Sequence, residues 1–379
     1  MGPLQGVRVV ELAGLGPAPF CAMLLGDMGA DVLRIDRPTP ADLGIPIPPA
    51  QDLLNRNKRS VALDLKSPAG QTAALRLTAG ADILIEGFRP GVMENLGLGP
   101  EACWKTNPKL VYGRMTGWGQ YGPLAQSAGH DLNYIAISGA LNSIGPGNGP
   151  PSIPLNLVGD FGGGALYLAM GVLAALTEAR SSGRGQVVDA AMVDGVANLM
   201  SFFYTFKNAG MWSLQRGENL LDGGAPFYDV YETKDGRYVS VAPIEQRFYR
   251  TMLDLIGLAP AALPNRNNRD EWAALHARFA EVFKTRTRDE WAALFAGTDA
   301  CVAPVLDMEE CIRHPHMAAR ECFVDLDGAI NPTPAPRFSR TPSELRRTPP
   351  APGQDTREAL LDWGFSAAEI NALCPDQAG

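Results

Sequence analysis

Short apolar runs alternate with longer helical patterns over the first 120 residues of the chain. The short runs are rich in Val, Ile and Leu, and glycine ends the longer stretches between them, as is typical of strands and helices respectively. This alternation predicts an α/β fold with a mostly parallel sheet covered by helices. The expected strands are Val7–Leu12, Asp31–Ile35, Ser60–Asp64, Ile83–Glu86 and Leu110–Arg114, and the expected helices are Pro19–Met28 and Ala69–Ala79.

Two long apolar stretches follow, and they predict helices over Gly162–Thr177 and Ala190–Phe206. The first stretch is too short to span a bilayer, so we expect a buried helix there. Beyond Asp222 the pattern changes to short alternating runs that flank Lys234-Asp235-Gly236, which predicts a β-hairpin with a type I′ turn. Three further helices are expected over 247–256, 270–283 and 289–296, so residues 224–305 form a smaller α/β domain. The spacing of Asn268 with Glu271, and of Thr287 with Glu290, is that of capping boxes.

The overall composition is that of an ordinary soluble protein, with 46% hydrophobic and 20% charged residues. Its net charge of −8 argues against nucleic acid or an anionic membrane as a partner. The six cysteines form no Cys-x-x-Cys pair, so we expect no metal site and a reducing, cytoplasmic location.

Basic residues cluster locally in spite of the acidic total. Arg37, Arg89 and Arg114 follow predicted strands, and the carboxyl ends of parallel strands meet at the edge of a sheet where ligands bind. Together with Arg56, Lys58 and Arg59 they form either a binding site for a polyphosphate or a solvated charged rim. A dinucleotide site is a weaker alternative, because Pro19 replaces the third glycine of the Gly14-x-Gly16 fingerprint.

Two segments place ionisable side chains directly after a glycine at the start of an apolar helical run. One contains Gly129-His130-Asp131, and the other contains Gly159-Asp160. Exposed N–H groups at a helix start favour acid/base chemistry, and the chain has only four histidines. The alternative is that Asp131 and Asp160 are plain helix caps and that His130 is a loop residue.

Taken together, segments along nearly the whole chain resemble the family III CoA-transferase superfamily, and within it the α-methylacyl-CoA racemase branch. These segments are Gly6–Leu12, Gly26–Val32, Arg56–Arg59, Asp64–Lys66, Arg89–Val92, Arg114–Gln120, Gly129–Asp131, Gly159–Asp160, Gly183–Asp189, Leu221–Pro226 and Ala335–Arg340.

The resemblance implies a Rossmann-like large domain, a small domain, two linkers and an interlocked homodimer. On this basis residues 1–185 and 321–379 form the large CoA-binding domain and 224–305 the small one. Residues 186–223 form a linker helix, and 306–320 form the second linker.

The resemblance also implies a function. Racemases of this branch interconvert (R)- and (S)-2-methylacyl-CoA through an enolate, with His130 and Asp160 on one face of the α-carbon and Glu245 on the other. The Asp131 N–H would stabilise the enolate oxygen. The segment around Glu245 departs from the usual Gly-Ala-x-Glu-Pro-Gln-Phe, because it reads Ala242-Pro243-Ile244-Glu245-Gln246-Arg247-Phe248.

The expected ligand contacts complete this interpretation. CoA would be held by Arg37, Arg56, Lys58, Arg59, Arg89 and Arg114, and the acyl group would lie near Gly223, Gly224 and Tyr134. The aromatic stripe of Phe202, Phe203, Phe206 and Trp212, with Met200, is either an acyl surface or core. No cofactor is expected beyond the CoA of the substrate. The alternatives are a CoA transferase that uses Asp160 as nucleophile and a non-catalytic acyl-CoA-binding relative, and the sequence does not indicate which acyl chain is preferred.

Overall fold

A computed structural model describes residues 2–39 and 46–374, which form two compact units. The first unit combines Met1–Ser138, Leu155–Leu199 and Arg320–Gly379, and the second combines Gly139–Pro154 and Met200–Ala319. The second unit therefore begins before the expected residue 224 and also takes in an earlier loop. The reason is Arg216, whose guanidinium donates to the carbonyls of Asn142, Pro146 and Gly149.

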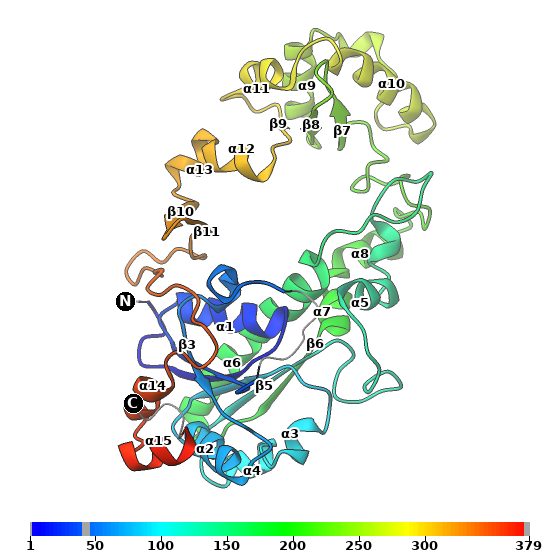
Figure 1. The fold of residues 1–379 in the computed structure, drawn as a ribbon. Coiled ribbons are helices and arrows are strands. Elements are labelled where there is room, and N and C mark those ends of the chain that lie inside the picture. Colours follow the sequence, from blue (N-terminus) through cyan, green and yellow to red (C-terminus); the bar gives the residue numbers. More distant parts are fainter. Residues whose placement is uncertain (1, 40–45, 375–379) are drawn as a thin grey trace. The chain divides into compact units, whose positions relative to one another are not determined.

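A six-stranded parallel sheet forms the centre of the first unit (Figure 1), in the order β3-β2-β1-β4-β5-β6. The strands are β1 (Arg8–Leu12), β2 (Asp31–Asp36), β3 (Lys58–Ala62), β4 (Ile83–Glu86), β5 (Val111–Thr116) and β6 (Val187–Ala191). Val9 pairs with Val32 of β2 on one side and with Ile83 of β4 on the other. The strand order reverses at β1, and the crevice beyond the carboxyl ends of such strands is where open α/β sheets bind ligands.

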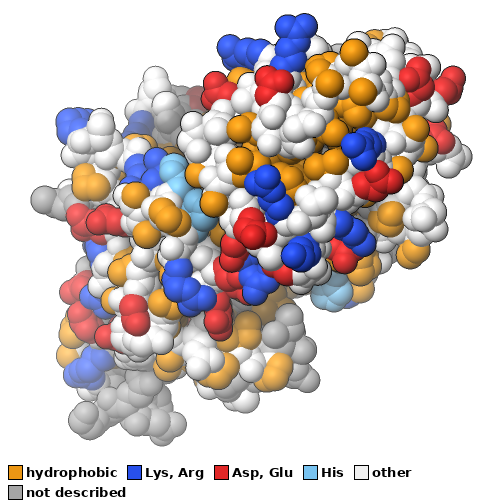
Figure 2. Space-filling view, turned by 90° about the horizontal axis from the view of Figure 1, so that it is seen from above, with side chains coloured by type: hydrophobic (Ala, Val, Ile, Leu, Met, Phe, Trp, Pro, Cys, Tyr) orange, Lys and Arg blue, Asp and Glu red, His pale blue; other side chains and the backbone are white. Residues whose placement is uncertain are grey.

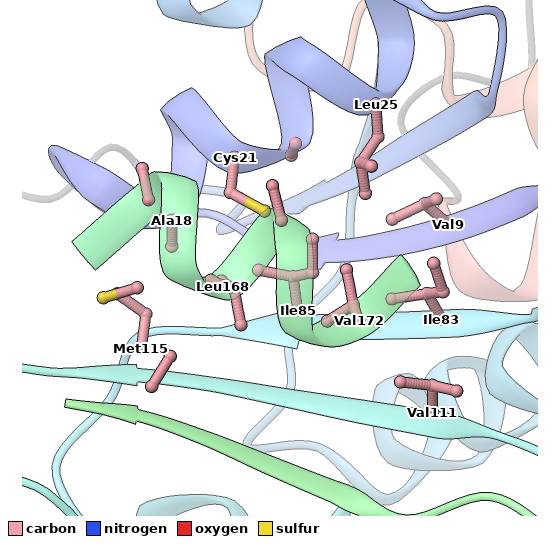
Figure 3. Close-up of a cluster of buried hydrophobic side chains, with 14 of the residues drawn as sticks. Val9, Ala18, Cys21, Leu25, Ile83, Ile85, Val111, Met115, Leu168 and Val172 are labelled. Atoms are coloured by element: carbon pink, nitrogen blue, oxygen red, sulfur yellow. The ribbon is translucent and has the colours of Figure 1, made fainter. Parts of the chain in front are cut away.

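Helices cover both faces of this sheet because the strands bury alternate side chains on opposite sides. Figure 3 shows α1 (Pro17–Asp27) and α6 (Leu166–Ser182) packing Cys21, Leu25, Leu168 and Val172 onto one face. The opposite face is covered by α2 (Pro68–Ala79), α4 (Pro100–Trp104), α14 (Thr356–Asp362) and α15 (Ala367–Leu373). The remaining elements of this unit are η1 (Pro49–Gln51), η2 (Leu53–Asn55), α3 (Val92–Asn95), α5 (Asp131–Ile137), η4 (Leu157–Ala165), α7 (Met192–Leu199), β10 (Phe323–Leu326) and β11 (Ala329–Pro332).

The helix expected over 162–177 is longer at both ends. It starts with η4, a nine-residue π-helical segment, and continues as α6. The combined helix Leu157–Ser182 has 26 residues and contains an 18-residue window with a mean hydropathy of 1.5, so it is long and apolar enough to cross a membrane by length and composition. The prediction that this apolar stretch is too short to span a bilayer is therefore wrong. A core helix passes the same test, and α6 buries Leu168 and Val172 completely.

The linker helix expected over 186–223 starts later than predicted. Residues Val187–Ala191 form β6, which pairs with β5, and the chain continues as α7 and, in the second unit, as α8 (Ser201–Asn208). The β-branched pair Val187 and Val188 favours a strand, but the short run around Asp189 hides it in the sequence.

The second unit contains a three-stranded antiparallel sheet with helices packed on it. Its strands are β7 (Asp229–Glu232), β8 (Tyr238–Val241) and β9 (Val302–Pro304), in the order β7-β8-β9. Besides α8, its helices are η3 (Leu141–Ser143), α9 (Gln246–Ile256), η5 (Pro260–Ala262), η6 (Arg269–Glu271), α10 (Trp272–Phe283), α11 (Arg288–Phe295), α12 (Met308–Arg313) and α13 (Pro315–Ala319). The core of this unit is rich in aromatic side chains, including Phe279, Phe283 and Trp291.

The predicted turn chemistry of this unit is partly right. Thr233 and Arg237 close the β7–β8 hairpin, but within the turn only Gly236 has a positive φ, of 72°. A type I′ turn needs two such residues, so the turn is of the type I kind followed by a left-handed glycine. Thr287 and Glu290 form the predicted capping box, whereas Asn268 starts the short η6 by accepting from the Asp270 N–H.

Candidate active site

The start of α5 brings two of the predicted catalytic residues together with a third from η4. His130 is the N-cap of α5 and is exposed, and its backbone N–H donates to the Asn133 side chain at 3.0 Å. Asp131 is buried, and its Oδ2 accepts the backbone N–H of Asp160 at 2.7 Å. Thirty residues of chain separate His130 from Asp160, but the fold joins their segments at one place in the first unit.

Asp160 is partly buried among polar groups and backbone. Its Oδ2 accepts from the Asn156 amide at 3.1 Å, and a Cβ added to Gly16 would lie 3.0 Å from the same oxygen. Burial raises the pKa of Asp160, and the charge of Asp131 adds to this rise, whereas Asn156 and the nearby His130 lower it. The sequence did not single out Asn156. Its signal is only the four-residue spacing to Asp160 on a helical segment.

Tyr134 holds the loop before His130 in place and does not line an open pocket. It is only 6% exposed, it contacts Trp118 edge-on at 4.7 Å between ring centroids, and its hydroxyl donates to the carbonyl of Gly129. Burial raises the pKa of Tyr134 to about 12, so the phenol is a hydrogen-bond donor at neutral pH. The expected acyl contact at Tyr134 is therefore replaced by a supporting role, because the core encloses the ring.

Two of the six predicted CoA-binding cations have the expected placement. Arg37 directly follows β2, Arg89 lies three residues beyond β4, and both are exposed near the carboxyl edge of the parallel sheet. The loop that carries Arg89 is held by Glu86, whose Oε2 accepts the Phe88 N–H at 2.7 Å. Burial raises the pKa of Glu86 to about 7. Lys66 is also exposed, beyond the carboxyl end of β3. The sequence analysis did not include it among the cations at this edge of the sheet.

The other four cations are buried and have partners within the protein. Arg56 pairs with Asp27 at 2.6 Å, Lys58 with Glu11 at 2.7 Å, Arg59 with Asp31 and Asp362, and Arg114 with Glu94 and Glu86. The sequence did not reveal these ion pairs, because each joins residues far apart in the chain. Arg56, Lys58 and Arg59 lie at the amino end of β3, and β5 extends to Thr116, so Arg114 lies inside the strand. A side chain that neutralises a buried carboxylate is not free to bind phosphate.

Glu245 belongs to the second unit. It is the exposed N-cap of α9, and its side chain makes no capping hydrogen bond to the helix. The unusual Pro243 segment before it is held by Arg266, which donates to the carbonyls of Pro243 and Ile244. The same guanidinium stacks over the rings of Phe227 and Tyr249 at 3.8 and 4.2 Å. These contacts keep the backbone path into Glu245 fixed.

Gly223 and Gly224 form a tight turn that Asp222 organises. The Asp222 carboxylate accepts from the N–H groups of Gly217, Asn219 and Gly224, and Gly223 has a φ of 84°. The aromatic stripe of α8 lies near a cavity of about 200 Å³ within the second unit. This cavity is lined by Phe206, Met211, Trp212, Leu220, Phe227, Arg266, Asn267, Arg269 and Trp272.

A second cavity, of about 280 Å³, lies in the first unit next to the β10–β11 turn. Its walls include Arg346, Arg347 and Asp355, and Lys58 contributes to them although its ammonium points inward to Glu11. Among the described residues, no three His, Cys, Asp or Glu side chains are grouped so that they could hold a metal ion. Figure 2 shows Lys and Arg side chains interspersed with Asp and Glu over the face that it displays.

Comparison with known proteins places the chain in a family. Residues 4–356 match the model of CoA-transferase family III, and the chain belongs to this family. It is 47% identical to the alpha-methylacyl-CoA racemase of Mus musculus, over 99% of the chain and 97% of that protein. It is 45% identical to the Homo sapiens racemase of the same name, again over 99% and 97%. A CAIB/BAIF family protein from Brucella suis has the same fold, with a TM-score of 0.83, 26% identity and coverage of 96% and 99%.

Proposed function

We propose that this protein is an isomerase that interconverts (R)- and (S)-2-methylacyl-CoA thioesters by moving a proton at C2. The observation that carries this proposal is the junction of α5 and η4, where His130 and Asp160 lie within electrostatic reach of each other. The high identity to two racemases over nearly the full chain supports it. The proposal includes no cofactor beyond the CoA of the substrate, because a proton transfer at C2 changes no oxidation state.

The chemistry follows from the local geometry. The exposed imidazole of His130 takes the proton from C2, and the electron pair of the broken C–H bond moves to the thioester oxygen as an enolate. The Asp131 N–H opens α5, where backbone donors lack helical partners, so it is suited to hold the enolate oxygen. The Asp160 carboxylate stabilises the imidazolium that forms.

Glu245 is the acid/base group for the opposite face of the α-carbon. Its carboxylate is exposed and is not used as a helix cap, so it is available for proton transfer. Return of a proton from Glu245 to the enolate gives the other enantiomer, and the reverse reaction exchanges the two roles. The phosphates of CoA are held by Arg37 and Arg89 at the sheet edge.

The proposed native form is a homodimer. Large apolar side chains on α6 and α7 of the first unit are strongly exposed in a single chain: Leu166 at 51%, Met170 at 62% and Leu199 at 44%. Contiguous exposed apolar surface is typical of an interface with another protein surface.

The test is incubation of the protein with one enantiomer of a 2-methylacyl-CoA in heavy water. The proposal expects deuterium gain at C2 together with loss of optical activity. A CoA transferase with Asp160 as nucleophile is the alternative, and it would instead move CoA to an added carboxylic acid without deuterium gain. That result would overturn the proposal.

A further inference from the structure

The carboxylate of Asp131 has no role in the chemistry described so far, which uses only its backbone N–H. It is nevertheless buried, with 6% of the residue exposed, between α5 and η4. One oxygen accepts the Asp160 N–H at 2.7 Å, and Oδ1 has no hydrogen-bond partner among the described residues. A buried, incompletely paired carboxylate costs folding free energy, so its presence calls for a reason.

The backbone before Asp160 is shaped to receive this carboxylate. A Cβ added at Gly159 would lie 2.4 Å from Asp131 Oδ2 and 2.8 Å from its Cγ. Only glycine therefore lets the carboxylate approach the Asp160 N–H. The contact falls within η4, a π-helical segment, and such segments are rare and frequently occur at functional sites.

The negative charge of Asp131 acts on Asp160 in the opposite sense to His130. Burial is the largest cause that raises the pKa of Asp160, Asp131 raises it further, and His130 lowers it. Titratable and charged groups on the elements that pack against η4 are Cys21 and Asp27 on α1, Tyr134 on α5, Tyr167, Glu178 and Arg180 on α6, Asp194 on α7, Tyr112 and Arg114 on β5, and Asp189 on β6. Asp131 and His130 are the two charged groups that shift the pKa of Asp160.

We propose that the Asp131 side chain is a positioning residue, which fixes the backbone of Asp160 and whose charge favours the protonated form of the His130–Asp160 pair. This inference rests on the proposed function. During the reaction the C2–H bond breaks, an N–H bond forms on His130, and the electron pair goes to the enolate oxygen. The charge of Asp131 then helps to retain the proton on the pair until Glu245 delivers its own proton to the other face.

The inference predicts a shifted pH profile. The charge of Asp131 raises the pKa of Asp160, so removal of that charge lowers the pKa of Asp160. We measure deuterium gain at C2 of one 2-methylacyl-CoA enantiomer between about pH 5 and pH 9, with Asp131→Asn and, as a matched charge control, Glu101→Gln. Glu101 is exposed on α4. In the pH profile of the exchange rate, the acid limb of Asp131→Asn shifts down by roughly one pH unit. The acid limb of Glu101→Gln stays at the wild-type pH.

Three outcomes are decisive. An unshifted acid limb in Asp131→Asn overturns the inference while wild-type exchange upholds the proposed function. Absence of exchange in wild type overturns the proposed function and this inference with it. If Asp131→Asn fails to fold, Asp131→Glu keeps the charge but displaces the carboxylate. It should then lose about tenfold or more of the exchange rate at the pH optimum, and a wild-type rate would refute the positioning role.

Discussion

Replacement of Lys58 by Met tests whether this lysine is a structural residue, as the fold indicates, or a CoA ligand. Lys58 Nζ lies 2.7 Å from Glu11 Oε2, and both side chains have no exposed surface. The ammonium also donates to the Pro19 carbonyl at 3.0 Å and to Asn55 Oδ1 at 3.2 Å. Lys58→Met leaves a buried carboxylate without its cation, which costs about 3–5 kcal/mol of unfolding free energy.

The loss should depend on pH in a defined direction. Burial raises the pKa of Glu11, and Lys58 counters part of that rise. Without the lysine, the folded-state pKa rises further above the unfolded value, so the native state binds more protons than the unfolded state. The stability of Lys58→Met therefore falls as the pH rises from about 5 to about 8, and its deficit relative to wild type is smallest in acid.

Urea unfolding at several pH values measures these effects. Lys66→Met is the matched control, because Lys66 is exposed just beyond the other end of β3, and its unfolding free energy should stay within about 0.5 kcal/mol of wild type. The double variant Glu11→Leu/Lys58→Met removes both charges and should recover most of the loss. A Lys58→Met protein as stable as wild type, but with weakened CoA binding, would refute the structural assignment.

Three further outcomes are expected. Arg89→Ala weakens CoA binding and makes it less sensitive to salt in calorimetric titrations, because phosphate contacts at an exposed edge are screened. The control variant Arg184→Ala, at an exposed arginine before the amino end of β6, has no effect. Equal behaviour of the two variants would exclude Arg89 as a ligand. Glu310→Gln lowers the unfolding temperature at pH 7, and the difference from wild type vanishes as the pH falls toward 2. The reason is that Arg288 holds the pKa of Glu310 at about 2, so the stabilisation is present above the unfolded value and is lost in acid; a difference independent of pH would contradict this reasoning. Light scattering should give twice the chain mass even at high dilution, and a stable, fully active monomer would contradict the proposed dimer.

The sheet was predictable because its strands are continuous apolar runs between glycines, and β1, β2 and β4 are predicted to within one residue. The start of β3 was not predictable in the same way. Lys58 and Arg59 are polar residues that enter a strand only because Glu11, Asp31 and Asp362 neutralise them from distant positions. These ion pairs join residues far apart in the chain, which no local pattern shows, and missing them led to the error about CoA-binding cations.

The candidate site shows the same division between local and long-range information. His130 at a helix start was visible from its glycine and the apolar run after it, and the structure confirms that position. Its proximity to Asp160 depends on how η4 packs on α5, which no local pattern encodes. The burial of Tyr134 was not predicted, because the ring occupies the space that a side chain at position 117 would fill. A Cβ added to Gly117 would lie 2.0 Å from the tyrosine ring.

The most direct test of the two-base account compares Glu245→Gln and His130→Ala on each enantiomer separately, with deuterium gain at C2 and loss of optical activity measured together. The account predicts that both variants lose racemisation. Glu245→Gln should retain deuterium gain with one enantiomer through His130, and His130→Ala should show the opposite enantiomer preference. If Glu245→Gln kept racemisation within about twofold of wild type, a barrier change of about 0.4 kcal/mol, the assignment of Glu245 and His130 as opposing bases would be contradicted.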